Sequence, residues 1–242
     1  MGRAYQNRKE SMAKTSDMKA KIYSRHSREI YMAAKAGGTD VSGNLTLRGL
    51  IERAKKDQVP AHVIDKALKK AESGAGEDFA PARYEGYGPG GCMVIVECLT
   101  DNPNRTFGDV RQAWTKTQCK IGTEGSVSHL FDHVAIFVFA YADEEAVLDA
   151  LMEADVDVID IENENGQLTV FAPHTEYFKT KQALLACCGD DTDFTVDEIQ
   201  FIPQAYTEIS GDDVELFEKF LAILDDVDDV QNIYHNVKQD AA

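Results

Sequence analysis

The sequence lacks the usual features of membrane and secreted proteins. Its longest strongly apolar run, from Val134 to Ala142, is far shorter than the ~20 residues that span a bilayer, so we expect no transmembrane helix. The opening stretch MGRAYQNRKE contains no hydrophobic segment of a secretory signal. The five cysteines are an odd number without C-x-x-C spacing, which argues against a disulfide framework and a zinc site. We therefore expect a cytoplasmic protein without a bound metal.

The sequence also has little that indicates a nucleotide cofactor. The segment GYGPGG matches G-x-G-x-x-G at Gly86, Gly88 and Gly91, but a phosphate-binding loop must follow a strand and open a helix. Here the apolar run CMVIVECL follows the glycines and predicts a buried strand. We interpret the segment as a tight turn into that strand, and we expect no cofactor and no enzymatic activity. This segment is the sole support for the alternative, an enzyme.

Charge is distributed very unevenly along the chain. The formal net charge is −17, yet residues 1–80 contain sixteen basic and ten acidic residues. The remainder contains nine basic and thirty-two acidic residues. An asymmetry of this kind indicates nucleic-acid binding at the basic end.

Apolar periodicity divides the chain into a helical beginning and an alternating remainder. Helices are predicted at 17–36, after Asn44 as N-cap, and from Pro60, followed by a linker at 73–82. The remainder predicts a strand at CMVIVECL, a polar loop at 101–106 that caps a helix through about residue 118, and a strand at 126–131. It then predicts strands at 134–141, 156–161, 167–172 and 194–203 with helices at 143–154 and 175–187. A helix at 212–225 and a strand at QNIYHNV follow.

We predict an α+β fold with a three-helix N-terminal domain followed by two α/β domains. The helical domain covers residues 1–80. Residues 133–203 have the β-α-β-β-α-β order of a ferredoxin-like module. Segments 81–132 and 204–242 need each other to bury their apolar faces, so we predict a discontinuous middle domain into which the module is inserted.

Several basic residues are candidates for contacts with phosphates. On the first helix, the spacing of Lys14, Lys21, Arg25, Arg28 and Lys35 places them on one face, and Arg3, Arg8 and Lys9 precede them. Like charges on one face repel, so their presence suggests a polyanionic ligand; the alternative is a solvated helix face. Arg105, at a predicted helix start, indicates an anion site or simply a capping loop.

Other polar clusters have simpler interpretations. DDVDDV, at residues 225–230, suggests Mg²⁺ or a basic partner, but a solvated helix end is the default because the EF-hand pattern is missing. His129 and His133 have the spacing of helical metal ligands, yet they lie in a predicted strand or hairpin, where such residues are ~13 Å apart. The cysteines lie in apolar strands or at a helix end, which favours a core role over a catalytic one.

Long motifs resemble the YebC family: YEGYGPGG (84–91), TDNPNRT (100–106), GTEGSVSHLF (122–131) and DDVDDVQNIYHNV (225–237). The resemblance covers nearly the whole chain, and the opening is similar to the branch that begins Met-Gly-Arg rather than to members with a His-Ser-Lys-Trp stretch. It implies a helical N-terminal domain and two α/β domains, one interrupted by the other. It also implies cytoplasmic DNA-binding transcriptional regulators in bacteria, translational activators in mitochondria, and some bacterial members that assist stalled ribosomes.

We therefore expect a non-enzymatic nucleic-acid-binding regulator whose partner is DNA. The alternative is a ribosome-associated translation factor that binds rRNA or tRNA and relieves stalling. We expect no membrane association, and a monomer or a weak dimer. The residues expected to contact nucleic acid are Arg3, Arg8, Lys9, Lys14, Lys21, Arg25, Arg28, Lys35 and Arg105.

Overall fold

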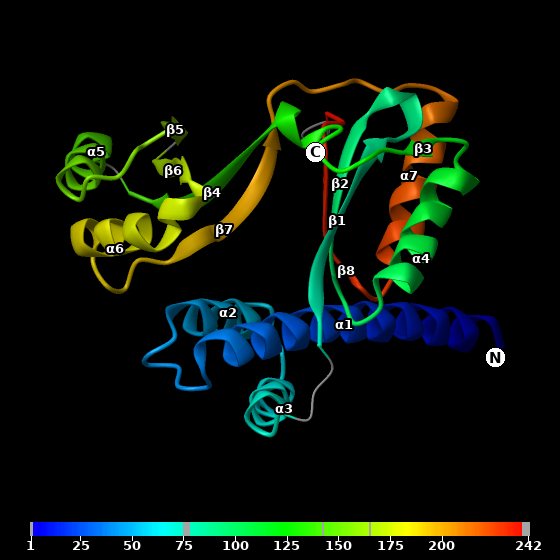
Figure 1. The fold of residues 1–242 in the computed structure, drawn as a ribbon, viewed down its shortest axis with the longest axis horizontal. Helices are drawn as coiled ribbons and strands as arrows, with labels where there is room; N and C mark the ends of the chain where they lie inside the picture. Colours follow the sequence, from blue (N-terminus) through cyan, green and yellow to red (C-terminus); the bar gives the residue numbers. More distant parts are fainter. Residues whose placement is uncertain (1, 75–77, 142, 165, 239–242) are drawn as a thin grey trace. The chain divides into compact units, whose positions relative to one another are not determined.

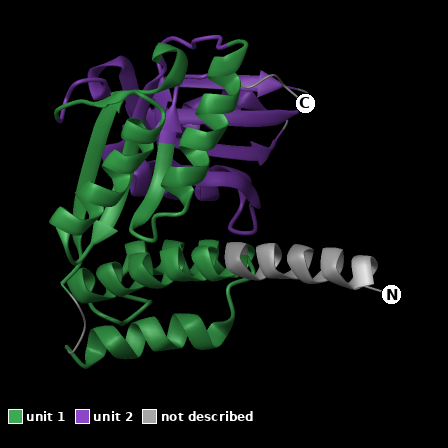
Figure 2. Cartoon of the chain, turned by 90° about the vertical axis from the view of Figure 1, so that its right-hand side faces the viewer, with its two compact units in different colours: residues 1–91, 95–123, 210–233 green, residues 92–94, 124–209, 234–242 purple. Residues whose placement is uncertain are grey.

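The fold begins with three helices and continues as two four-stranded sheets with their own helices (Figure 1). The computed structural model describes residues 2–74, 78–141, 143–164 and 166–238, with side chains from residue 19 onward. It divides into two units (Figure 2): unit 1 comprises residues 1–91, 95–123 and 210–233, and unit 2 comprises residues 92–94, 124–209 and 234–242. The predicted α+β class with a helical N-terminal segment is confirmed. The predicted three-domain boundaries stay a prediction.

The helical segment of unit 1 consists of α1 (Gly2–Gly37), α2 (Leu45–Lys56) and α3 (Ala61–Glu72). Asn44 caps α2 as predicted, because its Oδ1 accepts from the Leu47 amide at 3.0 Å. Its amide nitrogen also donates to the carbonyls of Ala33, in the last turns of α1, and of Gly38, just after the helix. The shared core includes Ile30, Tyr31, Leu47, Ile51 and Ile64. The predicted start of the first helix at residue 17 was wrong, since α1 begins at Gly2, and Pro60 is the N-cap of α3 rather than its first residue.

The first sheet has the strand order β3-β1-β2-β8. Its strands are β1 (Ala80–Tyr87), β2 (Met93–Thr100), β3 (Lys120–Ile121) and β8 (Val230–His235). Two helices, α4 (Pro103–Lys116) and α7 (Asp212–Asp225), lie side by side along it (Figures 1 and 2). They pack together through Trp114 and Phe220, whose rings meet edge to face with centroids 4.9 Å apart.

The glycine-rich segment forms the turn between β1 and β2. A 3₁₀ turn, η1 (Pro89–Gly91), lies there, and Gly90 and Gly91 have φ values of 67° and 74°, which favour glycine. Gly86 is needed for a different reason. A Cβ at this position would lie 2.9 Å from both the Gly122 amide nitrogen and Trp114 Nε1. The predicted turn is thus present, but the linker predicted to extend to residue 82 was wrong, because β1 begins at Ala80.

Unit 2 contains a ferredoxin-like series of elements. These are β4 (Phe131–Ala140), α5 (Glu144–Glu153), β5 (Asp160–Glu164), β6 (Gln167–Pro173), η3 (His174–Glu176), α6 (Tyr177–Cys188) and β7 (Phe194–Pro203). The sheet order is β5-β6-β4-β7 with antiparallel pairing, and Ala135 lies opposite Ala172 on one side and Ile199 on the other. Phe137, Phe139 and buried residues of both helices form its core.

Two strand predictions in unit 2 were wrong. Residues 156–161 were predicted as a strand, but β5 begins at Asp160, because the Val156 amide instead donates to the Leu151 carbonyl at the end of α5. Residues 126–131 were also predicted as a strand. They contain a 3₁₀ turn, η2 (Ser128–Leu130), and only Phe131 belongs to β4.

Candidate nucleic-acid interface

The cations of α1 face the acidic run at the end of α7. Lys21 Nζ lies 2.7 Å from Asp226 Oδ1, and Arg25 Nη2 lies 2.6 Å from Asp225 Oδ1. Arg25 Nε also donates to the Val230 carbonyl at 3.2 Å. The hydrogen bond with Asp226 is the main reason that the pKa of Lys21 is raised. Helical spacing places these basic side chains on one face, and that face contacts the acidic run at residues 225–230 of the same unit.

A tighter set of contacts surrounds Asp229. Its carboxylate is 5% exposed, lies 3.1 Å from Arg28 Nη1 and 2.9 Å from Arg105 Nη2, and accepts from Thr106 Oγ1 at 2.6 Å. Burial alone would raise its pKa, but the hydrogen bonds from Thr106 and Arg105 and the charges of Arg28 and Arg105 together lower it below its ordinary value. Arg28 also donates to the Asp228 carbonyl. The acidic run is thus anchored at Asp229. The predicted solvated helix end was wrong for this residue.

Arg105 forms an anion site whose anion belongs to the chain itself. The residue lies in the first turn of α4, where its amide donates to Asn102, the N-cap. Its guanidinium binds Asp229 and, at 2.7 Å, Asp101. The capping loop is thus confirmed, whereas binding of an external anion at Arg105 stays a prediction, because Asp101 and Asp229 already bind its guanidinium.

A polar cavity of about 650 Å³ opens beside these ion pairs within unit 1. Arg28, Arg105 and Lys116 contribute its positive charges. Five carboxylates also line it, those of Asp101, Asp109, Asp226, Asp228 and Asp229. Acidic groups therefore outnumber basic ones in the cavity, which disfavours an anionic ligand in it.

The remaining predicted cations differ in their surroundings. Lys35, near the end of α1, pairs with Asp78. Arg3, Arg8, Lys9 and Lys14 lie on α1, but their side chains fall outside the described residues. The structure thus brings Lys21, Arg25, Arg28 and Arg105 together around one acidic run, whereas Lys35 has a separate partner. Binding of nucleic acid by this set stays a prediction.

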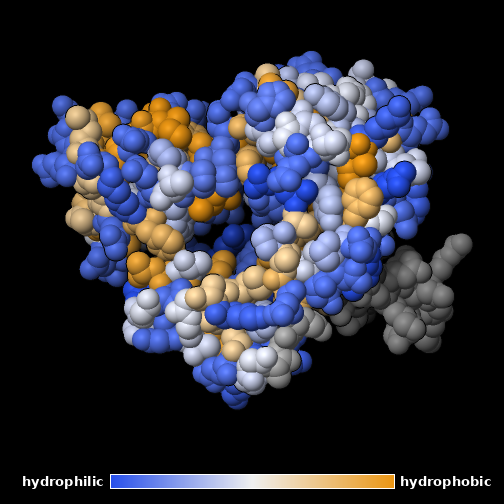
Figure 3. Space-filling model, in the orientation of Figure 1, coloured by the Kyte–Doolittle hydropathy of each residue, from blue (hydrophilic) through white to orange (hydrophobic). Residues whose placement is uncertain are grey.

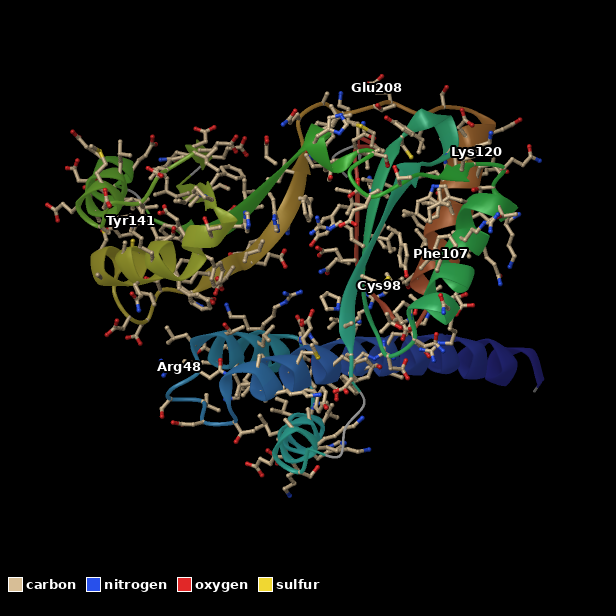
Figure 4. The ribbon with its side chains drawn as sticks, viewed as in Figure 1. Arg48, Cys98, Phe107, Lys120, Tyr141 and Glu208 are labelled. Atoms are coloured by element: carbon tan, nitrogen blue, oxygen red, sulfur yellow. The ribbon has the colours of Figure 1, made fainter. Side chains whose placement is uncertain are left out.

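Other cations are exposed on α2 and α3. Arg48 on α2 donates to the carbonyls of Val41 and Ser42 in the preceding loop (Figure 4). Lys55, Lys66 and Lys69 are exposed, and they are unpaired within the described part of the chain. The sequence reasoning missed these lysines because they do not form a regular row. The apolar stripe of each short helix predicts which face is buried, so lysines outside that stripe could have been predicted to be exposed.

Among the other candidates, Cys98 is a buried thiol and the two histidines belong to different elements. Burial raises the pKa of the Cys98 thiol on β2 to about 12 (Figure 4), so the thiol stays protonated and unreactive. His129 lies in η2 and His133 in β4. Among the described residues, no three His, Cys, Asp or Glu side chains are grouped to hold a metal ion. No helix in the described ranges is long and apolar enough to cross a membrane.

The two units differ sharply in charge. Unit 1 contains 22 basic and 22 acidic residues, whereas unit 2 contains 3 basic and 20 acidic residues. The whole net charge of −17 therefore lies on unit 2, and the basic helices of unit 1 are balanced by acidic residues of the same unit. Figure 3 shows hydrophilic side chains, in blue, spread over the visible face of both units, with smaller hydrophobic patches among them.

Comparison with known proteins decides the family. Residues 3–74 match the model of the TACO1/YebC protein N-terminal domain, and residues 79–237 match that of the TACO1/YebC second and third domain. The chain belongs to the TACO1/YebC family. The resemblance read from the sequence is thus confirmed.

Relatives in this family match the chain over almost its full length. A probable transcriptional regulatory protein from Alcanivorax borkumensis is 73% identical over 237 residues, which are 98% of this chain and 99% of the relative. One of the same description from Marinobacter nauticus is 71% identical over 238 residues, 98% of each chain. The crystal structure of a conserved hypothetical protein from Aquifex aeolicus is 30% identical, with a TM-score of 0.73 and 90% of each chain covered. The names of the curated relatives support a regulatory role for this TACO1/YebC member.

Proposed function

We propose that this chain is a non-enzymatic regulator that binds DNA through the phosphate backbone, using the cations of helices α1, α2 and α3. The proposal rests on the contacts that the basic side chains of α1 make. Lys21, Arg25 and Arg28 all contact one short segment, through the carboxylates of Asp225, Asp226 and Asp229 and the carbonyls of Asp228 and Val230. A face that binds several carboxylates close together has the charge and the hydrogen-bond donors required for neighbouring phosphates.

The exposed lysines of α3 supply the first contacts in this proposal. Lys66 and Lys69 are three residues apart on one helix and are exposed, so both can approach a phosphate strand together. They also have no ion-pair partner within the described residues that a phosphate would have to displace. Each contact releases condensed counterions, which makes the affinity depend steeply on salt.

The charge of unit 2 favours a single binding side. With 20 acidic and 3 basic residues, this unit repels a polyanion at distances within the Debye length. Repulsion of this kind orients a molecule during encounter more than it changes the final affinity. We therefore expect DNA to contact the helical segment of unit 1 and not the ferredoxin-like module.

Fluorescence anisotropy with a labelled DNA duplex over a salt series tests the proposal. We expect Lys66→Ala/Lys69→Ala to weaken binding several-fold and to reduce the salt slope by about 0.9 for each phosphate that is no longer neutralised. The matched control is Lys120→Ala/Lys219→Ala, which removes two exposed lysines of unit 1 from outside the helical segment. Equal effects of the two double variants would refute the assignment to the helices. A single-stranded RNA of the same sequence is the comparison probe, and consistently tighter binding of that RNA would overturn DNA as the ligand.

A further inference from the structure

We propose that the acidic run Asp225–Asp229 is an intramolecular competitor that covers Lys21 and Arg25 until DNA displaces it. The inference rests on the proposed function, because it concerns access to the same basic face. It adds a regulatory step, in which part of the face is closed in the free protein and opens as phosphates arrive.

The ion pairs along the run are graded from exposed to buried. The side chains of Asp226 and Asp225 are 80% and 53% exposed, whereas that of Asp229 is 5% exposed. Exposed ion pairs contribute little to stability, because water and salt screen them. Breaking a buried pair leaves an uncompensated charge and is strongly unfavourable. Asp225 and Asp226 can therefore leave their partners while Asp229 keeps the segment attached.

The same difference in exposure determines which basic side chains can reach the phosphates of DNA. Lys21 and Arg25 are paired with the two exposed carboxylates, while Arg28 is held by Asp229 and the Asp228 carbonyl. Displacement of the exposed part thus frees Lys21 and the Nη2 end of Arg25, whose Nε keeps its hydrogen bond to the Val230 carbonyl, and it leaves Arg28 in place. The competitor consists of carboxylates, which bind Lys and Arg through the same charge-assisted hydrogen bonds as phosphate oxygens.

A purely structural role for these ion pairs predicts a different outcome. If the pairs only fasten α1 to the end of α7, their removal loosens this junction and does not improve DNA binding. If they compete with phosphates, their removal exposes Lys21 and Arg25 and tightens DNA binding. Affinity therefore separates the two roles.

The test measures duplex DNA affinity of the full chain by anisotropy for Asp225→Asn/Asp226→Asn and for Glu215→Gln/Glu218→Gln. The control pair lies on the same helix, is exposed, and removes the same two charges without a partner among the described side chains of α1. We expect about 5–10-fold tighter binding for the first variant, from two released cations, and a change within about 2-fold for the control. Adding Lys21→Ala/Arg25→Ala to the first variant should remove the gain. Circular dichroism verifies that each variant is folded.

Each outcome decides one of the two proposals. Equal affinity of the wild type and Asp225→Asn/Asp226→Asn, equal gains in the control, or a gain that survives Lys21→Ala/Arg25→Ala would overturn the competitor and leave DNA binding standing. If Asp225→Asn/Asp226→Asn binds DNA and the wild type does not, the acidic run blocks the basic face completely, which supports the competitor. Absence of DNA binding in every variant would overturn the proposed function and this inference with it.

Discussion

Replacing Asp229 by Asn should destabilise unit 1 far more than replacing its neighbour Asp228. The buried Asp229 carboxylate has three partners, on α1 and α4, and removing one member of a buried ion pair costs about 3–5 kcal/mol. Arg105 keeps Asp101 as a partner and is itself 48% exposed, and asparagine retains one acceptor oxygen. We therefore expect a loss of about 2–3 kcal/mol. The exposed side chain of Asp228 should contribute less than about 0.5 kcal/mol.

Urea unfolding followed by tryptophan fluorescence measures this difference. Trp114 is the sole tryptophan of the sequence and is buried between α4 and α7, so it reports on unit 1. With a slope of about 2–3 kcal/mol/M, Asp229→Asn should lower the midpoint by about 1 M. Equal midpoints for the variants at positions 228 and 229 would refute the reasoning.

The same carboxylate predicts a pH dependence. Because the pKa of Asp229 is lowered from its ordinary value of 3.8, its stabilisation is fully present above that value and is lost as the pH falls through the folded-state pKa. The gap in unfolding free energy between wild type and Asp229→Asn should therefore be constant from neutral pH to about pH 5 and shrink below about pH 4. A gap that began to close near pH 6 would contradict this assignment.

Substitutions at three further positions test local features of the fold. Gly86→Ala should lower the urea midpoint by an amount corresponding to about 1–3 kcal/mol, because its Cβ would meet the Gly122 amide and Trp114 at 2.9 Å; an unchanged midpoint would show that the sheet edge yields easily. Gly49→Ala, where nothing lies within 4 Å of the added carbon on α2, should raise stability by about 0.5–1 kcal/mol in thermal unfolding. Asn44→Ala should cost about 2–3 kcal/mol by the same method, and Asn44→Asp, which keeps the capping oxygen but loses the donating amide, should fall between it and wild type.

Local sequence signals predicted much of the fold. The bounds of β7 and α7 agree with the prediction, because alternating residues and a continuous helical stripe reach both ends of these elements. The N-caps of α2 and α4 were also predicted, since Asn44 and the loop before α4 have the appropriate side chains. The early part of α1 was missed because the sequence of residues 2–16 is mostly polar and has no apolar period. The strand β1 was missed because Gly86 interrupts it and the preceding sequence SGAGEDFAPA, at 73–82, has the composition of a linker.

The candidate site could be predicted only as two separate halves. The row of Lys21, Arg25 and Arg28 follows from helical spacing, and the acidic run is plain in the sequence. Their pairing joins residues about 200 positions apart, and no periodic pattern encodes such a contact. The buried role of Asp229 was hidden for the same reason, since neighbouring Asp225 and Asp226 have the same chemistry but remain exposed.

The long separation between α1 and its acidic partners has a consequence for synthesis. Ribosomes add about 5–20 residues per second, so α1 emerges roughly 10–40 seconds before Asp225 and Asp226 exist. Strands β4 to β7 are complete before then and can already pair, whereas unit 1 must wait for β8. During that interval Lys21 and Arg25 lack the carboxylates of Asp225 and Asp226, so we expect a nascent chain to bind RNA more tightly than a finished one.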